Sequence, residues 1–251
     1  MKAKLKQGDC HEELPKLEKN VVDLCLVDPP YNTTSASWDQ QPLDWEKLWE
    51  ELKRVSTEEA PFVFTAAQPF THKLIRSNFE DFRYTLVWLK THPSNAINAH
   101  RKPMTKHEDI VVFYRKAGAY SPETTELSSP RTNGRSGDTE KYIYNIRESS
   151  EQTETGFPTS VIEAGRDNRT SGTDHPTEKP VSLMEKLIGM YSGEGDTVLD
   201  VTVGSGTTGV AAMKKGRDFI GFETDSEYFE KAKERIEGAK SKQSQVNKFF
   251  E

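Results

Sequence analysis

A short apolar strand that stops at two prolines is the feature that most restricts the fold of this sequence. Residues 21–27 read Val-Val-Asp-Leu-Cys-Leu-Val, nearly continuous in apolar side chains and rich in β-branched ones. A run of this kind predicts a strand buried inside a parallel sheet, with helices over both faces. The prolines that follow end the strand. The sequence therefore favours an α/β fold in which this strand lies near the centre.

The four residues after this strand suggest a binding site. They are Asp28, Pro29, Pro30 and Tyr31. The prolines remove two backbone donors, but their carbonyls can still accept hydrogen bonds. Together with the acid and the aromatic ring, they form a compact holder for a flat ring that carries an amine. The alternative is a tight turn after a core strand, because Asp-Pro often marks turns.

A glycine-rich turn far along the chain points to a nucleoside ligand. A predicted strand at residues 197–200 is followed by Gly204, Gly206 and a predicted helix at residues 207–215. Glycines at such a turn allow close approach of a ligand, and a helix N-terminus favours a carboxylate or phosphate. The next strand, residues 219–222, ends at Glu223, where an acid can bind ribose hydroxyls. No P-loop lysine follows the glycines, which argues against a nucleotide triphosphatase. A generic α/β turn is the alternative.

Three further segments complete a family resemblance. Residues 8–10 are Gly-Asp-Cys, residues 175–180 are His-Pro-Thr-Glu-Lys-Pro, and two predicted strands carry Val-Trp-Leu-Lys at 87–90 and His-Glu-Asp-Ile-Val-Val-Phe at 107–113. With the two motifs above, they resemble the permuted, β-group DNA amino-methyltransferases that use S-adenosyl-L-methionine (AdoMet). The resemblance spans residues 5–235 with gaps. In one departure, Val201 and Thr202 stand where the family usually has Pro-Phe, so one aromatic contact to the cofactor is missing.

The resemblance implies a permuted, Rossmann-like α/β methyltransferase sheet with an inserted target-recognition region. The chain would open with the third and fourth strands of the unpermuted fold, at residues 4–8 and 21–27, and end with the first and second. The intervening pattern predicts helices at 43–55 and 70–79 and strands at 61–66 and 84–90. We expect the catalytic, AdoMet-binding domain to comprise residues 1–90 and 176–251.

The chemistry of an exocyclic amine on a nucleobase suggests catalytic roles for the Asp-Pro-Pro-Tyr motif. An exocyclic amine conjugated to a base is a poor nucleophile because its lone pair is delocalised. Hydrogen bonds to the Asp28 carboxylate and the Pro29 carbonyl would favour a pyramidal nitrogen and expose the lone pair for in-line attack on the sulfonium methyl. Positioning and charge placement then suffice, without a covalent intermediate. Tyr31 would stack on the base, which must leave the duplex.

The resemblance also assigns the cofactor contacts. Asp9 would face the adenine of AdoMet, Glu223 its ribose, and Asp200 the methionyl amine. Thr177 and Lys179 would bind the methionyl end; for Lys179 the alternative is a solvated lysine at a helix start. The loop that shapes the pocket comprises Gly204, Ser205, Gly206, Thr207 and Thr208. No residues show the spacing of a metal site.

The middle of the chain, residues 91–175, is the predicted target-recognition region. After a strand at 109–114, residues 117–174 are dense in small polar side chains, with one predicted strand at 141–146, and long irregular segments in compact enzymes are often functional. The net charge of −6 is unusual for a DNA-binding protein, but residues 90–179 hold thirteen basic and thirteen acidic residues, so the excess of acids lies outside this part of the chain. Its candidate DNA contacts are Arg101, Lys102, Lys106, Arg131, Arg135, Arg166 and Arg169.

Adenine N6 in duplex DNA is the favoured target, because family members with Asp at the first position of the Asp-Pro-Pro-Tyr motif are mostly adenine enzymes. The alternatives are cytosine N4, adenosine in RNA, and a catalytically silent subunit that only binds nucleic acid. Intact Asp28, Tyr31 and the glycine loop argue against the silent subunit. A restriction–modification role follows from the resemblance.

The two cysteines exclude one related chemistry. Cys10 and Cys25 lie beside or within predicted strands and are expected to be reduced thiols. Neither follows a proline, as the nucleophile of cytosine-C5 methyltransferases does. No long apolar run indicates secretion or a membrane span, so we expect a cytoplasmic, nucleoid-associated protein.

The C-terminal tail, residues 240–251, carries a separate motif. A charged helix is predicted at 226–236, and the tail then reads Gln-Ser-Gln-Val-Asn-Lys-Phe-Phe. The spacing resembles the peptide that docks on the PCNA sliding clamp, a helix-in-groove interaction. Its anchors would be Gln243, Val246, Phe249 and Phe250. Alternatively, the aromatic residues fold back on their own domain or contact a second copy in a homodimer.

Overall fold

The computed structural model describes residues 1–32, 43–118, 120–122, 124–132, 151–165 and 178–250, without the side chains of residues 125, 127, 130–132, 151–152 and 244–250. The chain divides into two compact units. The larger unit comprises residues 1–121 and 160–251, and the smaller one comprises residues 122–159.

The larger unit is built on a mixed sheet with the strand order β1-β10-β9-β2-β3-β5-β4-β8. Its parallel half contains β1 (Ala3–Gln7), β10 (Asp218–Glu223), β9 (Thr197–Asp200), β2 (Leu24–Val27) and β3 (Phe62–Ala66). The other half contains β5 (Thr105–Phe113), antiparallel to both β3 and β4 (Phe82–Ser94), and β8 (Val161–Ala164), parallel to β4.

This order confirms the permuted topology. The strands β9 and β10, from the C-terminal part of the sequence, lie between β1 and β2, which come from its beginning. Four residues of β2 are fully buried, as the continuous apolar run predicted for a strand with both faces covered. The carboxyl ends of β10, β9, β2 and β3 therefore meet at one edge of the sheet, where ligands bind in open α/β folds.

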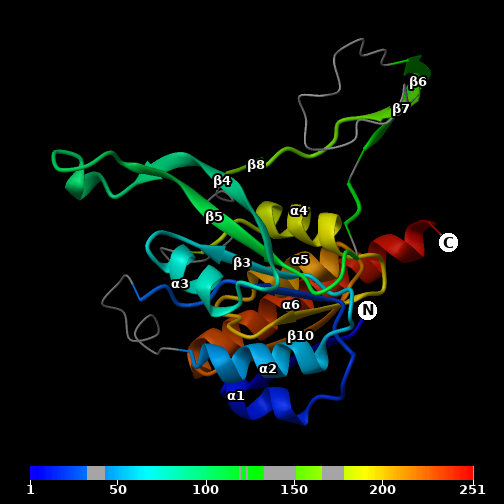
Figure 1. The fold of residues 1–251 in the computed structure, drawn as a ribbon. Helices are drawn as coiled ribbons and strands as arrows, with labels where there is room; N and C mark the ends of the chain where they lie inside the picture. The colour runs from blue at the N-terminus through cyan, green and yellow to red at the C-terminus, as the bar shows by residue number, and fades with distance from the viewer. Residues whose placement is uncertain (33–42, 119, 123, 133–150, 166–177, 251) are drawn as a thin grey trace. The chain divides into compact units, whose positions relative to one another are not determined.

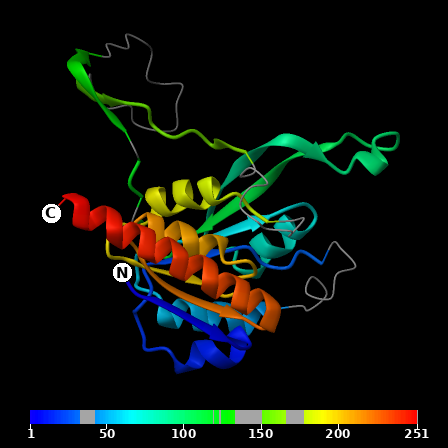
Figure 2. The same cartoon turned by 180° about the vertical axis from the view of Figure 1, so that it is seen from behind.

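Helices cover both faces of the sheet (Figures 1 and 2). One face carries α4 (Val181–Tyr191), α5 (Thr207–Lys214) and α6 (Ser226–Phe250), with a core that includes Leu187 and Met213. The other face carries α1 (Cys10–Glu13), the 3-10 turn η1 (Leu14–Lys16), α2 (Trp45–Val55) and α3 (Phe70–Ser77), with a core that includes Trp49 and Phe113. Among the described helices, none is both long and apolar enough to cross a membrane.

Three elements, β4, β5 and α6, are longer than the sequence pattern predicted. The strands β4 and β5 continue past the sheet as a hairpin, visible in both views, which closes through the 3-10 turn η3 (Ala96–Asn98). Asn95 adopts a left-handed conformation, φ 68°, and its Oδ1 accepts from Asn98 Nδ2 at 2.7 Å, which braces the turn. The helix α6 runs on from the predicted end at residue 236 to Phe250.

The smaller unit holds a two-stranded antiparallel sheet of β6 (Thr125–Thr132) and β7 (Glu151–Thr155). The strand predicted at residues 141–146 lies outside the described residues. The target-recognition role of residues 91–175 stays a prediction. The hairpin part of that region continues the main sheet, and only residues 122–159 form the separate unit.

Candidate active site

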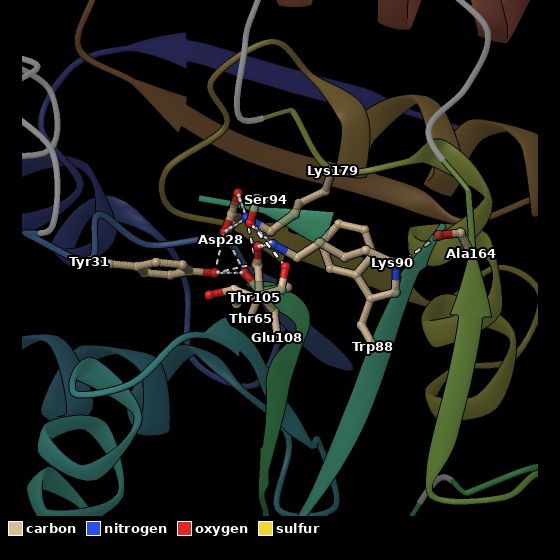
Figure 3. A network of polar contacts seen from close by, with 10 residues as sticks. All are labelled: Asp28, Tyr31, Thr65, Trp88, Lys90, Ser94, Thr105, Glu108, Ala164 and Lys179. Atoms are coloured by element: carbon tan, nitrogen blue, oxygen red, sulfur yellow. Dashed lines mark hydrogen bonds and ion pairs between the residues drawn. The ribbon is translucent and has the colours of Figure 1, made fainter. Parts of the chain in front are cut away.

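The site begins at Asp28, the first residue after β2, where the backbone leaves the sheet. Three side chains donate to the Asp28 carboxylate (Figure 3). The Tyr31 hydroxyl lies 3.0 Å from Oδ1, the Thr65 hydroxyl donates to the same oxygen, and Lys179 Nζ lies 2.9 Å from Oδ1 and 3.0 Å from Oδ2. The Asp28 side chain is 31% exposed, so solvent or a ligand can still reach it.

A second carboxylate lies behind this one. Glu108, on β5, has Oε2 at 3.3 Å from Lys179 Nζ and Oε1 at 2.7 Å from the Nζ of Lys90, on β4. The side chains of Lys179, Glu108 and Lys90 are only 7–14% exposed. The cluster therefore alternates two acids and two bases, and Asp28 is its most accessible member.

Burial alone would lower the pKa of Lys179, but the carboxylates of Asp28 and Glu108 outweigh it, and the pKa lies above its ordinary value. Lys179 is therefore an ammonium ion at neutral pH. For Tyr31, burial and the same two acids raise the pKa well above its ordinary value, so its hydroxyl stays protonated as a donor.

The ring of Tyr31 has an aromatic and a cationic neighbour. It stacks on Phe70 of α3 with centroids 5.3 Å apart, and Lys179 Nζ lies 5.1 Å from the ring centroid. The predicted stacking of Tyr31 on a target base stays a prediction, and the base would have to compete for a face that Lys179 or Phe70 now occupies.

The glycine-rich turn after β9 is held by its neighbours. The Gly204 amide donates to Glu223 Oε2 at 2.7 Å, while Oε1 of the same carboxylate accepts from the Asp225 amide at 2.9 Å. Gly204 and Gly206 both have positive φ, 53° and 86°. A Cβ on Gly206 would stand 2.9 Å from the Ala232 backbone, so close packing of α6 requires glycine there, whereas a Cβ on Gly204 would meet no atom within 4 Å.

Asp200 is the buried acid of this turn, 1% exposed. Burial raises its pKa to about 7, although the Thr202 amide, at 3.0 Å from Oδ1, and the Thr208 hydroxyl favour the charged form. The nearby charges of Asp28 and Glu223 push the pKa in the same direction as burial. A cationic group bound here would reverse this shift, which fits the ammonium of a methionyl group.

Two residues that the sequence analysis did not single out brace the loop. Glu178 Oε1 accepts from the Thr207 hydroxyl at 2.9 Å and pairs with Arg235 of α6 at 2.7 Å, and Arg235 also donates to the Ser205 carbonyl at 2.6 Å. Glu178 lies inside the His-Pro-Thr-Glu-Lys-Pro segment, at a position where the family resemblance specifies no residue type. Nothing in the sequence pattern indicates the partner on α6.

The family departure at Thr202 has a structural role of its own. Its hydroxyl donates to the Asp28 backbone carbonyl at 3.1 Å, which joins the turn after β9 to the turn after β2. Val201 beside it is buried at 3% exposure. The residues that replace the usual Pro-Phe therefore link the two motifs, which an aromatic side chain could not do by this hydrogen bond.

The Gly-Asp-Cys segment lies at the neighbouring strand end. Asp9 caps α1 by accepting from the His11 amide at 2.8 Å, and the Gly8 amide donates to the Glu223 carbonyl at 2.9 Å. Its contact with the cofactor adenine stays a prediction. Ligand atoms of Asp9, Cys10 and His11 lie within 4.8 Å of one another. However, burial and Asp9 raise the pKa of Cys10 to about 12, which opposes the thiolate that a metal would need.

The remaining predicted residues divide into exposed, buried and undescribed ones. Arg101, Lys102 and Lys106 are exposed on the β4–β5 hairpin. Lys179 is 8% exposed, so the alternative of a solvated lysine is wrong. Cys10 and Cys25 are buried free thiols. Thr177, Arg135, Arg166 and Arg169 lie outside the described residues, as do the side chains of Arg131, Val246, Phe249 and Phe250.

Sequence reasoning missed Thr65, Lys90 and Glu108, although a signal for two of them exists. Alternation along a strand places Trp88 and Lys90 on one face of β4, and Glu108 lies opposite Trp88 across the β4–β5 pair. Trp88 Nε1 donates to the Ala164 carbonyl at 3.0 Å, which holds this face of the sheet in place. The signal for Lys90 and Glu108 is that each is a charged residue within a strand that also contains buried apolar residues. The pairing that joins them was not readable from the sequence.

Comparisons with known proteins agree with this geometry. Residues 22–234 match the model of a family described as DNA methylase, for N6 and N4 enzymes. The type II methyltransferase M.HpaI of Haemophilus parainfluenzae is 29% identical over 233 residues, which cover 89% of this chain and 71% of that protein. The DNA adenine methyltransferase YhdJ of Escherichia coli strain K12 is 27% identical over 247 residues, 92% of this chain and 82% of that protein.

Solved structures share the fold. The M1.HpyAVI–SAM complex has a TM-score of 0.62 at 23% identity and covers 93% of this chain and 99% of that one. The cytosine-N4-specific PvuII DNA methyltransferase has a TM-score of 0.65 at 14% identity and covers 97% of this chain and 93% of that one. Both likenesses concern the fold.

Proposed function

We propose that this chain, which belongs to the N6/N4 DNA methylase family, transfers a methyl group from AdoMet to the N6 amine of an adenine flipped out of duplex DNA. The observation that supports this proposal most directly is the Asp28 carboxylate at the end of β2, which is held by three donors and whose backbone is hydrogen-bonded to the turn after β9. This is the acceptor that an exocyclic amine requires, placed at the edge of the sheet where a nucleoside cofactor binds.

The described residues fit the methyl donor. When bound, AdoMet supplies an electrophilic methyl group on a sulfonium. Asp200 offers a buried carboxylate for the methionyl ammonium, Glu223 offers a carboxylate already aimed by two backbone amides, and the open side of Gly204 leaves room for close approach. The family resemblance adds Asp9, Thr177 and Lys179 to this set.

The chain's own residues position the amine. Among the described residues, Asp28 Oδ2 accepts from Lys179 alone, so this oxygen is the better acceptor for an incoming N–H. The Pro29 carbonyl would take the second N–H, which favours a pyramidal nitrogen with its lone pair directed at the methyl. Tyr31 and Thr65 fix the carboxylate through Oδ1. Positioning of this kind accounts for much of the rate in reactions without a covalent intermediate.

Two observations support adenine over cytosine. The first is Asp rather than Ser at position 28, and the second is the relative YhdJ, which is named as an adenine enzyme. The PvuII enzyme, with the same fold, is named for cytosine N4. Cytosine N4 is accordingly the second candidate. The relatives named as type II methyltransferases support a restriction–modification setting.

The exposed basic residues of the β4–β5 hairpin support duplex DNA as the substrate. Residues 91–107 contain no acid, in a chain whose net charge is −6. Arg101, Lys102 and Lys106 are exposed on this hairpin, which is continuous with the strands that carry Lys90 and Glu108. Phosphate contacts here would orient the duplex toward Asp28.

The test is methyl transfer from labelled AdoMet to mixed-sequence duplex DNA, followed by mass spectrometry of the nucleosides. We expect N6-methyladenine from the native protein and none from Asp28→Ala. Glu58→Gln, an exposed acid before β3, is the control and should retain activity. N4-methylcytosine would overturn the choice of base. Methylation of RNA alone, or none despite AdoMet binding, would overturn DNA methylation by this chain acting alone.

The C-terminal residues support a separate partner proposal, the PCNA clamp. The backbone of α6 is helical through Phe250, so Val246, Phe249 and Phe250 have the i, i+3, i+4 spacing of anchors on one helix face. Deleting residues 246–251 should abolish capture of the chain by PCNA and leave methylation of short duplexes intact. Retained capture would overturn the proposal, and light scattering of both forms tests whether this tail makes a homodimer instead.

A further inference from the structure

We propose that Lys179 is a specificity-determining residue that donates to the ring nitrogen beside the target amine, while Asp28 accepts from that amine. Glu108 is the positioning residue that holds Lys179 for this contact. The inference rests on the proposed function and assigns Lys179 to the target base instead of the methionyl end of the cofactor.

The Asp28 carboxylate has a limited capacity to accept hydrogen bonds. A carboxylate offers about four lone-pair sites. In the structure Tyr31, Thr65 and Lys179 all donate to Oδ1, and Lys179 also donates to Oδ2. An incoming amine needs one of these sites. Lys179 is the donor that bridges both oxygens and also has another carboxylate, that of Glu108, at 3.3 Å. Lys179 is therefore the partner that can yield Oδ2.

The buried charge of Lys179 requires a partner of opposite charge. Its side chain is 7% exposed, and a buried ammonium without a partner is strongly unfavourable. Glu108 keeps it paired when Oδ2 is given up. Lys90, at 2.7 Å from the other oxygen of Glu108, holds that carboxylate in place, and Lys90 itself donates to Ser94 Oγ at 3.3 Å (Figure 3). The ammonium thus stays beside Asp28 as a donor.

The hydrogen-bonding edge of the base must complement Asp28 and Lys179. Adenine and cytosine each carry the exocyclic amine, a donor, next to a ring nitrogen that accepts. Asp28 and Lys179 present an acceptor and a donor 2.9–3.0 Å apart, the complementary pair. On their Watson–Crick edges, guanine and thymine place a carbonyl and an N–H there, which would set oxygen against carboxylate and N–H against ammonium. The pair would accept adenine and cytosine and reject the other two bases.

The experiment uses duplexes whose target base lacks one ring nitrogen. The parent base is whichever one the native protein methylates. For adenine the analogues are 1-deazaadenine and 7-deazaadenine, and for cytosine the analogue is 3-deazacytosine. The measured quantity is the ratio of kcat/KM for the parent base to that for the analogue. Weakened base pairing affects every variant equally, so comparing this ratio between variants cancels it.

With the native protein, the kcat/KM for methylation of one deaza analogue should be lower than that for the parent base by about tenfold or more, as expected for a lost hydrogen bond to a charged group. In Lys179→Met the ratio should fall by at least that factor relative to native. In Glu108→Gln this ratio should lie between the values of the native protein and Lys179→Met, while AdoMet affinity and the unfolding temperature stay unchanged. In Lys179→Arg the ratio should be higher than in Lys179→Met, because the arginine keeps a charged donor. Glu163→Gln, an exposed glutamate on the neighbouring strand β8, is the matched control and should keep the native ratio.

The outcomes separate this inference from the proposed function. Equal ratios in native protein and Lys179→Met, while the parent duplex is methylated, overturn the role of Lys179 and leave DNA methylation standing. If Lys179→Met does not fold, a native ratio in Glu108→Gln overturns the positioning role by itself. No methyl transfer to any duplex by the native protein overturns the proposed function, and this inference with it.

Discussion

At the scale of single residues, the hydroxyl and the ring of Tyr31 make different contacts. The hydroxyl donates to Asp28 and Thr65, and the ring packs on Phe70. Tyr31→Phe keeps the ring, so we expect the free energy of unfolding to change by no more than roughly 1 kcal/mol. The kcat should fall about tenfold, because the Asp28 carboxylate is held less firmly. Tyr31→Ala should also raise the KM for DNA. Steady-state kinetics check both, and equal effects of the two substitutions would show that the hydroxyl alone matters.

Asp200 predicts a pH dependence for cofactor binding. Its pKa is about 7 because it is buried, so below that pH it is largely neutral and a weak partner for an ammonium group. AdoMet affinity should therefore rise as the pH increases from 6 to 7 and level off above about 8, as the carboxylate forms. Calorimetric titration at several pH values measures it. Asp200→Asn should bind weakly at every pH with no such rise, and a rise that persists in this variant would assign the titration to another group.

The raised pKa of Asp200 also affects the stability of the protein without cofactor, which should decrease as the pH rises. The pKa of Asp200 is raised relative to about 3.9 in the unfolded chain, so its native-state contribution is greatest below pH 4 and decreases as the pH rises through 7. Bound AdoMet would offset that loss by pairing with the charged form. A residue that costs stability near neutral pH and binds a cation is a typical functional compromise.

At the scale of elements, the β4–β5 hairpin should supply phosphate contacts. Replacing Arg101, Lys102 and Lys106 together by Gln should weaken DNA binding and reduce the slope of log K against log salt by up to roughly three, about 0.9 for each phosphate contact. AdoMet affinity should not change, because these side chains are exposed on the hairpin. Fluorescence anisotropy across a salt series provides the slope.

A matched triple variant controls for net charge. Lys2, Lys4 and Lys16 line a hollow beside the first residues of β9 and β10, at the edge of the sheet opposite to Asp28. Their replacement by Gln changes the charge by the same amount and should leave the salt slope unchanged. An equal reduction in both triple variants would mean that long-range charge, and not the hairpin, governs binding.

At the scale of the whole molecule, the family resemblance predicted the permuted order of the strands. The two motif-bearing turns were predicted from the sequence itself, because strand ends with prolines or glycines leave strong local signals. It did not predict the pairing of Glu108 with Lys90 and Lys179. Those residues come from β5, β4 and the segment before α4, and only the register of the sheet brings them together. The Glu178–Arg235 contact was unpredictable for the same reason, since it joins residues far apart in sequence through the packing of α6.

The division into two units predicts that cofactor binding and DNA recognition can be separated. Residues 122–159 form their own unit, while Asp28, Asp200 and Glu223 all belong to the larger one. We would replace residues 122–159 by a flexible Gly/Ser linker of about twelve residues, which spans on the order of 20 Å. AdoMet affinity and the unfolding temperature should remain near native, because the core and the cofactor turns lie outside the deleted segment.

DNA methylation should fall by more than a hundredfold in the same variant if residues 122–159 carry base-reading contacts, as the target-recognition prediction requires. Methyl transfer to single-stranded DNA at high concentration should fall less, since that substrate needs no duplex to be opened. Full activity on duplex DNA would restrict recognition to the β4–β5 hairpin. Loss of AdoMet binding would instead show that the smaller unit supports the fold of the larger one, because Asp200 and the glycine turn depend on the packing of α5 and α6.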